Sequence, residues 1–175
     1  MTTPISWGGT RVGAAPNISF GIQANPFGVV RLLAAGLNIN ANSATTDYQL
    51  QLGAILNFSG ATGTPVATTS AVYPSVWIAG STYQINQVAY NNPSTSLTTA
   101  TGGVFTATSA GGTTIVSDAA LSGLTATTNG TLLIPSLATN AQKNVYTGTS
   151  IYFRIGTAQG AAATLDVYIF GVVYP

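Results

Sequence analysis

Apolar and polar residues alternate along several short stretches of this chain, which is the pattern of a half-buried β-strand. In residues 47–52, Tyr48, Leu50 and Leu52 fall on one face of an extended segment, and glutamines fall on the other. Residues 151–155 repeat this alternation with larger apolar side chains. The same reasoning predicts further strands at 82–90, 103–108, 113–117, 131–135 and 165–174.

The phase of the alternation predicts which side chains share a face in residues 82–90. Counting every second residue places Tyr83, Ile85 and Gln87 together and Val88 on the opposite face. We therefore expect Val88 to point away from the side on which Tyr83 and Ile85 lie.

Residues 165–174 are apolar on both faces of the predicted strand. A strand with one solvated face carries polar residues there. This strand is therefore expected either to lie between two layers or to face another subunit. One face holds Leu165, Val167, Ile169 and Val173, and the other holds Asp166, Tyr168, Phe170, Val172 and Tyr174.

Turn-forming residues separate the predicted strands. Ser109–Gly112 lies between two of them, and the hairpin dipeptide Asn129-Gly130 precedes residues 131–135. About eight short strands with little helix indicate an all-β, antiparallel sandwich or barrel. We favour a jelly roll, with an immunoglobulin-like sandwich as the alternative.

The domain organisation follows from the less regular segments. Residues 1–26 contain isolated apolar residues without a sustained period, which favours an extended N-terminal arm, although a first strand plus a loop is the alternative. Residues 27–37 form an apolar run that fits either a short helix or a buried strand. Residues 27–175 then form one domain, with a possible exposed insertion at 53–80.

Charge is almost absent from the 175-residue chain. It has four Lys and Arg residues, three aspartates, no histidine and no cysteine, and its net charge is +1. Ordinary soluble domains contain about 25% charged residues, whereas this chain contains 4%. Net charge normally keeps a free monomer in solution. The composition therefore suggests a subunit whose surface is largely covered by neighbours.

The same scarcity weakens most chemical hypotheses, and we expect a protein that is not an enzyme and has no cofactor. The carboxylates are Asp47, Asp118 and Asp166, and nothing in the sequence places two of them together as a glycosidase needs. Zinc prefers Cys and His, which are missing. We therefore predict no catalytic, cofactor-binding or metal-binding residues.

The basic residues are dispersed along the chain, at Arg11, Arg31, Lys143 and Arg154. We therefore expect no nucleic-acid partner, because phosphate binding needs clustered Lys and Arg. The longest apolar run, 27–37, is shorter than the roughly 20 residues that a membrane span needs. No membrane partner is expected either.

Two regions resemble virion structural proteins of tailed bacteriophages. One is residues 83–112, YQINQVAYNNPSTSLTTATGGVFTATSAGG, and the other is residues 151–171, IYFRIGTAQGAAATLDVYIFG. The similarity extends over about residues 83–174. The chain departs from the pattern in its low charge and in residues 53–80.

The resemblance implies a head decoration (cement) protein with a jelly-roll core. Such a protein would bind the major capsid protein across capsomer junctions on the outer surface of the virion, as a homotrimer, and would stabilise the assembled head. The arm residues expected to contact the capsid or a neighbouring subunit are Ile5, Trp7, Ile18 and Phe20. The residues expected at the subunit interface are Tyr168, Phe170 and Tyr174.

Three alternative roles remain open within the same resemblance. One is a tail or neck component, and another is a capsid protein of jelly-roll type. The third is a receptor- or glycan-binding module in which Trp7, Trp77 and nearby tyrosines form a platform for sugar rings. Aromatic residues are also enriched at protein–protein interfaces, which favours an assembly surface.

Overall fold

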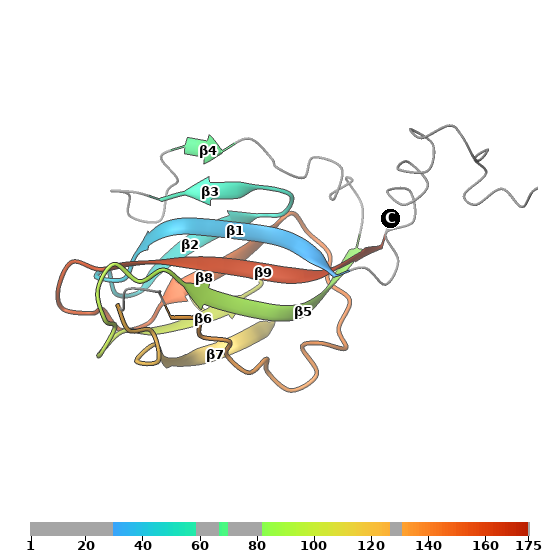
Figure 1. The fold of residues 1–175 in the computed structure, drawn as a ribbon. Helices are drawn as coiled ribbons and strands as arrows, with labels where there is room; N and C mark the ends of the chain where they lie inside the picture. Colours follow the sequence, from blue (N-terminus) through green and yellow to red (C-terminus); the bar gives the residue numbers. More distant parts are fainter. Residues whose placement is uncertain (1–29, 59–66, 70–81, 127–130, 175) are drawn as a thin grey trace, which may run out of the picture.

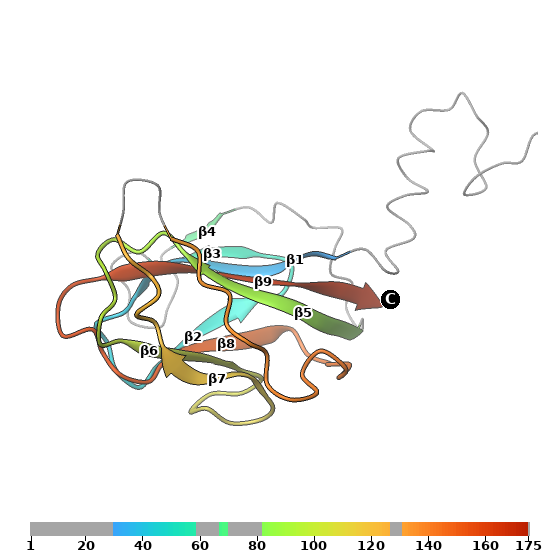
Figure 2. The same ribbon diagram turned by 60° about the horizontal axis from the view of Figure 1, so that its bottom comes forward.

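A computed structural model of the chain describes residues 30–58, 67–69, 82–126 and 131–174. In this part of the chain the backbone forms two β-sheets that pack face to face, and it forms no helix (Figure 1, Figure 2). The predicted all-β sandwich is therefore confirmed. The predicted arm, residues 1–26, lies outside the described residues.

Nine strands make up the two sheets of the described chain. One sheet has the order β4-β3-β1-β9-β5 and the other has the order β2-β8-β6-β7. The strands are β1 (Arg31–Asn40), β2 (Thr46–Gln51), β3 (Ile55–Asn57), β4 (Ala67–Thr69), β5 (Thr82–Asn91), β6 (Thr101–Phe105), β7 (Thr114–Ala120), β8 (Ser150–Ile155) and β9 (Thr164–Tyr174).

The five-stranded sheet is built around β9, which pairs antiparallel with β1 on one side and with β5 on the other. β3 runs parallel to β1, and β4 forms the edge. β3 and β4 belong to residues 53–80, the segment in which the sequence suggested an insertion. Leu56 and Phe58 from this segment are buried, so they contribute to the core.

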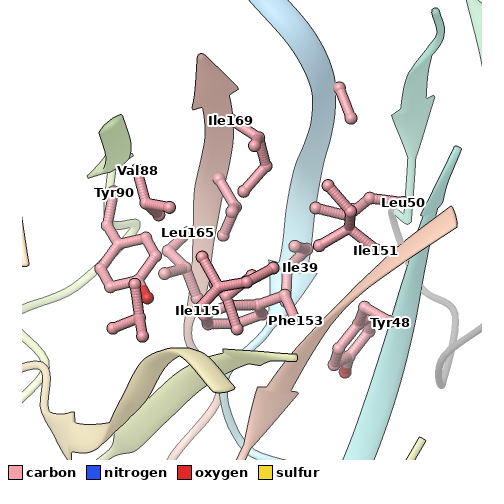
Figure 3. Packing of buried hydrophobic residues seen from close by; sticks show 14 of the residues in the cluster. Ile39, Tyr48, Leu50, Val88, Tyr90, Ile115, Ile151, Phe153, Leu165 and Ile169 are labelled. Atoms are coloured by element: carbon pink, nitrogen blue, oxygen red, sulfur yellow. The ribbon is translucent and has the colours of Figure 1, made fainter. Parts of the chain in front are cut away.

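The core fills the space between the sheets, and both contribute large side chains (Figure 3). The predicted faces of residues 47–52 and 151–155 are confirmed, because the alternating apolar residues of both are buried. On the other face Gln49 and Gln51 are exposed, and Tyr152 and Arg154 are half-buried. Tyr48 meets Phe58 edge to face at 5.3 Å between ring centroids, and Tyr90 meets Phe153 at the same distance. Such aromatic pairs add to the free energy gained by burial.

A β-bulge in β5 overturns the predicted phase of that strand. The pairing with β9 shifts between Ile85 and Gln87, which leaves Asn86 as an extra, exposed residue. An inserted residue reverses the alternation beyond it. Val88 is consequently buried in the same core as Tyr83 and Ile85, and the prediction that it points the other way is wrong.

The apolar run at 27–37 proves to be a strand from the start of β1, which settles the choice between helix and strand. Its pairing with β9 is interrupted between Gly36 and Ile39. Asn38 lies within this interruption with a φ of 54°, a left-handed conformation that asparagine tolerates better than most residues.

The strand predicted at 131–135 is wrong in extent, because Leu133 forms an isolated bridge with Tyr90 instead of a continuous strand. The two residues exchange backbone hydrogen bonds of 2.8 and 2.9 Å. Pro135 has no N–H with which to continue the ladder. The hairpin dipeptide before this segment lies outside the described residues.

Candidate interaction surface

The outer face of the five-stranded sheet carries two of the aromatic residues that the sequence assigned to a subunit interface. Tyr168 and Phe170 are two positions apart on β9, so they project from the same face. Across β5, Ala89 is opposite Tyr168 and Gln87 is opposite Phe170. Both aromatic side chains are half-buried, and they form the wall of a groove.

This groove, which we call the β5–β9 groove, has a volume of about 380 Å³. Val30 and Leu132, at its rim, have 53% and 60% of their surfaces exposed, which is high for aliphatic residues. None of the side chains that line the groove is charged. They are Val30, Gln87, Ala89, Asn91, Leu132, Tyr168 and Phe170.

The two aromatic rings in the groove are arranged in a stack. Their centroids are 6.5 Å apart and their planes are inclined by 22°. The Tyr168 hydroxyl lies 3.4 Å from Asp166 Oδ2 and donates a weak hydrogen bond to it. Burial raises the pKa of Tyr168, and the negative charge of Asp166 raises it further. Tyr168 therefore presents a neutral ring at physiological pH.

Tyr174, the third predicted interface residue, does not line this groove. It is four residues beyond Phe170, a separation of about 13 Å along a strand. Its hydroxyl donates a hydrogen bond of 2.5 Å to Gln84 Oε1 on the neighbouring strand. The structure thus brings Tyr168 and Phe170 together and places Tyr174 at the far end of β9.

Asp166 is a structural acceptor beneath this surface. Although it falls on the outward phase of β9, its residual exposure is 6%. Its Oδ1 accepts a hydrogen bond from the Asn38 backbone N–H at 2.8 Å, and its Oδ2 accepts one from Asn92 Nδ2 at 3.1 Å. The Asp166 carboxylate therefore supplies a hydrogen-bond acceptor where the pairing of β1 with β9 is interrupted.

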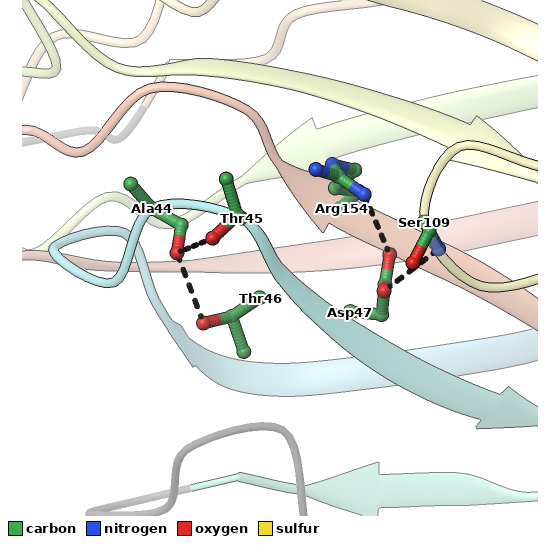
Figure 4. A network of polar contacts seen from close by, with 6 residues as sticks. All are labelled: Ala44, Thr45, Thr46, Asp47, Ser109 and Arg154. Atoms are coloured by element: carbon green, nitrogen blue, oxygen red, sulfur yellow. Dashed lines mark hydrogen bonds and ion pairs between the residues drawn. The ribbon is translucent and has the colours of Figure 1, made fainter.

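A second polar network lies on the other sheet (Figure 4). Asp47 and Arg154 are cross-strand partners on β2 and β8, and their nearest side-chain atoms, Oδ1 and Nη1, are 3.8 Å apart. Asp47 Oδ2 also accepts a hydrogen bond of 2.9 Å from the Ser109 backbone N–H. Asp47 thus fastens the loop between β6 and β7 to the sheet. Nearby, the hydroxyls of Thr45 and Thr46 donate to the Ala44 carbonyl.

The three aspartates lie in separate places. Asp166 belongs to the five-stranded sheet, whereas Asp47 and Asp118 lie on β2 and β7 of the other sheet. Three strand spacings, about 14 Å, separate the backbones of β2 and β7. The Asp118 side chain reaches across β6 towards the end of β8, where its Oδ2 lies beside Gly156. Within the described residues, no group of three acidic, His or Cys side chains is positioned to hold a metal ion.

A larger groove of about 790 Å³ lies beside β7, and we call it the β7 groove. Its opposite wall is residues 131–139, which we call the crossing segment because it runs from one sheet to the other. The crossing segment pairs with Tyr90 through Leu133, and its Ala138 N–H donates to the Ile115 carbonyl on β7 at 2.8 Å. It thus closes the open side of the sandwich.

Tyr90 lies at the base of the β7 groove. Its hydroxyl is buried and has no hydrogen-bond partner among the described residues. Burial, together with the charge of Asp118, strongly raises the pKa of Tyr90, so the hydroxyl stays protonated. The hydroxyl is covered by the core, so a ligand resting in the groove does not reach it without a rearrangement.

The sequence did not single out Val30 or Leu132 as surface residues. Val30 and Leu132 reach the groove only because the fold brings β1, β9, β5 and the crossing segment together, and these segments are distant in sequence. The sequence nevertheless contained a signal for Leu132. In an extended segment, Leu132 and Ile134 point to the side opposite to Leu133, and both are more than half exposed. The predicted contacts Ile5, Trp7, Ile18 and Phe20, and Trp77 of the alternative platform, lie outside the described residues.

No helix in the described part of the chain is long and apolar enough to cross a membrane. The chain matches no protein-family model, no curated protein and no solved structure.

Proposed function

We propose that this protein is a non-enzymatic structural component of a tailed-bacteriophage virion, a decoration (cement) protein that binds the outside of the capsid as a homotrimer. It bridges junctions between capsomers of the major capsid protein. The observation that carries the proposal is the uncharged, aromatic-walled β5–β9 groove on an exposed sheet face. An exposed apolar surface of this kind is typical of a protein–protein contact.

The distribution of charge supports an assembly role. Asp47 pairs with Arg154, and Asp166 is engaged inside the fold. These contacts leave very few ionic groups on the surface of the described residues. A neutral surface favours association, whereas a free monomer depends on charge repulsion to stay dispersed. The chain is therefore suited to permanent contact with neighbours.

The strand order supports a jelly-roll topology. In a jelly roll, two Greek keys distribute eight strands over two sheets. The order β1-β9-β5 in one sheet and β2-β8-β6-β7 in the other follows this scheme for seven strands. The crossing segment, bridged to β5 through Leu133, occupies the place of the eighth. In this assignment β3 and β4 are an addition to the outer edge of the first sheet.

The mechanism that we propose is burial of apolar surface on the assembled shell. Each Å² of apolar surface removed from water contributes about 25 cal/mol before the entropic cost of association. A protein that binds the completed shell and not its free subunits stabilises the shell by mass action. Few ions take part, so attachment is expected to depend weakly on salt.

Binding to particles tests the proposal. The purified protein is mixed with capsids that lack it, and the bound fraction is measured by sedimentation, followed by cryo-electron microscopy of the complex. We expect saturable binding at positions between capsomers, retained at moderate salt. Deleting residues 1–26 is expected to weaken binding while the β-sheet spectrum is unchanged. Absence of the protein from the capsid surface in the intact virion would refute the proposed role.

A further inference from the structure

We propose that residues 17–22, Asn17-Ile-Ser-Phe-Gly-Ile, bind in the β5–β9 groove through the side chains of Ile18 and Phe20. The inference rests on the proposed function in one respect, which is that residues 1–26 act as a binding arm. It adds the place on this protein where that arm binds. The inference is supported by the position of the groove, by the alternation of apolar and polar residues in the segment, and by the absence of charge from both.

The groove lies where the N-terminal segment joins the sandwich. Val30 is the first described residue, and it lines the groove. An extended chain spans at most about 3.6 Å per residue, so Phe20 stays within about 36 Å of Val30. This tether keeps the segment at a high effective concentration near the groove of its own chain and of any adjacent copy.

The pattern of the segment matches the lining of the groove. Ile18, Phe20 and Ile22 alternate with Asn, Ser and Gly, so an extended backbone presents three apolar side chains on one face. The groove offers the stacked rings of Tyr168 and Phe170 as an apolar wall. Burial of aromatic and aliphatic side chains against such a wall is favourable.

Neither partner carries a charge that association would bury. No Lys, Arg or Asp occurs between Val12 and Val30. The residues that line the groove are apolar or neutral, and the Gln87 amide can hydrogen-bond to the backbone of an extended segment. Asn91 Nδ2 can do so as well, whereas Asn91 Oδ1 already accepts a hydrogen bond of 2.7 Å from the Asn92 backbone N–H. Association therefore avoids the large cost of desolvating an ion.

The absence of cysteine from the chain permits a direct test by disulfide trapping. The full-length double variant Phe20→Cys/Leu132→Cys is oxidised mildly, and the product is analysed on a non-reducing gel. A disulfide needs Cβ atoms about 3.5–4.5 Å apart. Leu132 is 60% exposed, so this substitution leaves the core intact, and thermal melting of the reduced protein checks it. We expect rapid and nearly complete bond formation.

Two matched pairs provide the controls. Ser19→Cys/Leu132→Cys moves the thiol to the opposite face of the segment, and Phe20→Cys/Val145→Cys pairs it with an aliphatic residue that is 55% exposed outside the groove. Both are expected to react much more slowly. Equal rates in all three pairs, or no bond in the first, would overturn the inference.

The gel also separates this inference from the proposed function. A cross-linked monomer means that the segment occupies the groove of its own chain, and cross-linked oligomers mean that it occupies a neighbour's groove. Either product supports the inference, but only cross-linked oligomers agree with the groove as a contact between subunits. Because the experiment contains no capsid, trapping in the groove by a protein that fails to bind particles would refute the capsid role alone. Binding to particles without trapping would refute the groove assignment alone.

Discussion

The backbone N–H of Asn38 donates a hydrogen bond of 2.8 Å to Oδ1 of Asp166, across the irregularity that interrupts the pairing of β1 with β9. A side chain thus satisfies a backbone donor that the sheet ladder leaves open. Such donors are costly when they are buried without a partner. This contact ties the stability of the five-stranded sheet to one carboxylate.

We expect Asp166→Ala to destabilise the protein by about 1–3 kcal/mol, because the N–H of Asn38 loses its acceptor. Asp118→Ala is the control, since Asp118 is exposed and its replacement is expected to change stability by less than about 0.5 kcal/mol. The free energy of unfolding is measured by denaturant titration. Equal stability of the two variants would mean that the Asp166 contact contributes nothing.

Two buried tyrosines are expected to respond oppositely to the loss of their hydroxyls. The Tyr48 hydroxyl donates to the Asn40 carbonyl at 2.8 Å, whereas the Tyr90 hydroxyl has no partner in the described structure. Tyr48→Phe is expected to cost about 1 kcal/mol, and Tyr90→Phe to be neutral or stabilising. The midpoints of thermal unfolding compare them. A large loss in Tyr90→Phe would show that this hydroxyl has a bonding partner.

The free energy of unfolding is expected to decrease at alkaline pH. Burial raises the pKa of Tyr48 and of Tyr83 to about 12 from the ordinary 10. Between these values the unfolded chain releases protons that the folded chain retains, so the free energy of unfolding decreases as the pH rises from about 10 to about 12. A shift of two pKa units corresponds to at most about 2.7 kcal/mol of this loss for each tyrosine.

Denaturant unfolding at pH 8 to 11, with tyrosinate absorbance recorded in parallel, tests the alkaline transition. Tyr48→Phe removes one of the titrating groups, so its stability is expected to depend less steeply on pH. A free energy of unfolding that stays constant up to pH 11 would contradict the expected protection of the tyrosines.

Self-association is expected to depend on the β5–β9 groove. Leu132→Ser removes an aliphatic side chain at its rim, and Val145→Ser removes one of similar exposure elsewhere. We expect weaker oligomers in Leu132→Ser and an unchanged oligomeric state in Val145→Ser, with both proteins equally stable. Sedimentation velocity measures this difference, and identical profiles would argue against the groove as an interface.

The sequence predicted most reliably the strands in which alternation is unbroken. β2 and β8 lie opposite each other with an uninterrupted register, so every second residue of the pattern is buried as expected. β5 was misjudged beyond Ile85, because the bulge at Asn86 depends on how the strand fits β9. Periodicity within one segment contains no information about its neighbour.

The candidate surface was predicted in part for a similar reason. Tyr168 and Phe170 were identifiable, because an aromatic outward face on a single strand is visible in the sequence. Val30 and Leu132 join them through the order of the sheet, which places four distant segments side by side. Tyr174 shares their phase but lies too far along β9 to share the groove.

The position of β9 has a consequence for how this protein is made. β9 is the last of the nine described strands to be synthesised, yet it lies between β1 and β5 and bonds to both. The five-stranded sheet cannot close until β9 has left the ribosome. Folding is therefore expected to wait for residues 164–174 and to be slow, as in other proteins whose contacts span long sequence separations. A nascent chain interrupted before residue 164 would expose its unpaired strands to proteases, so the fold itself selects for chains that extend through β9.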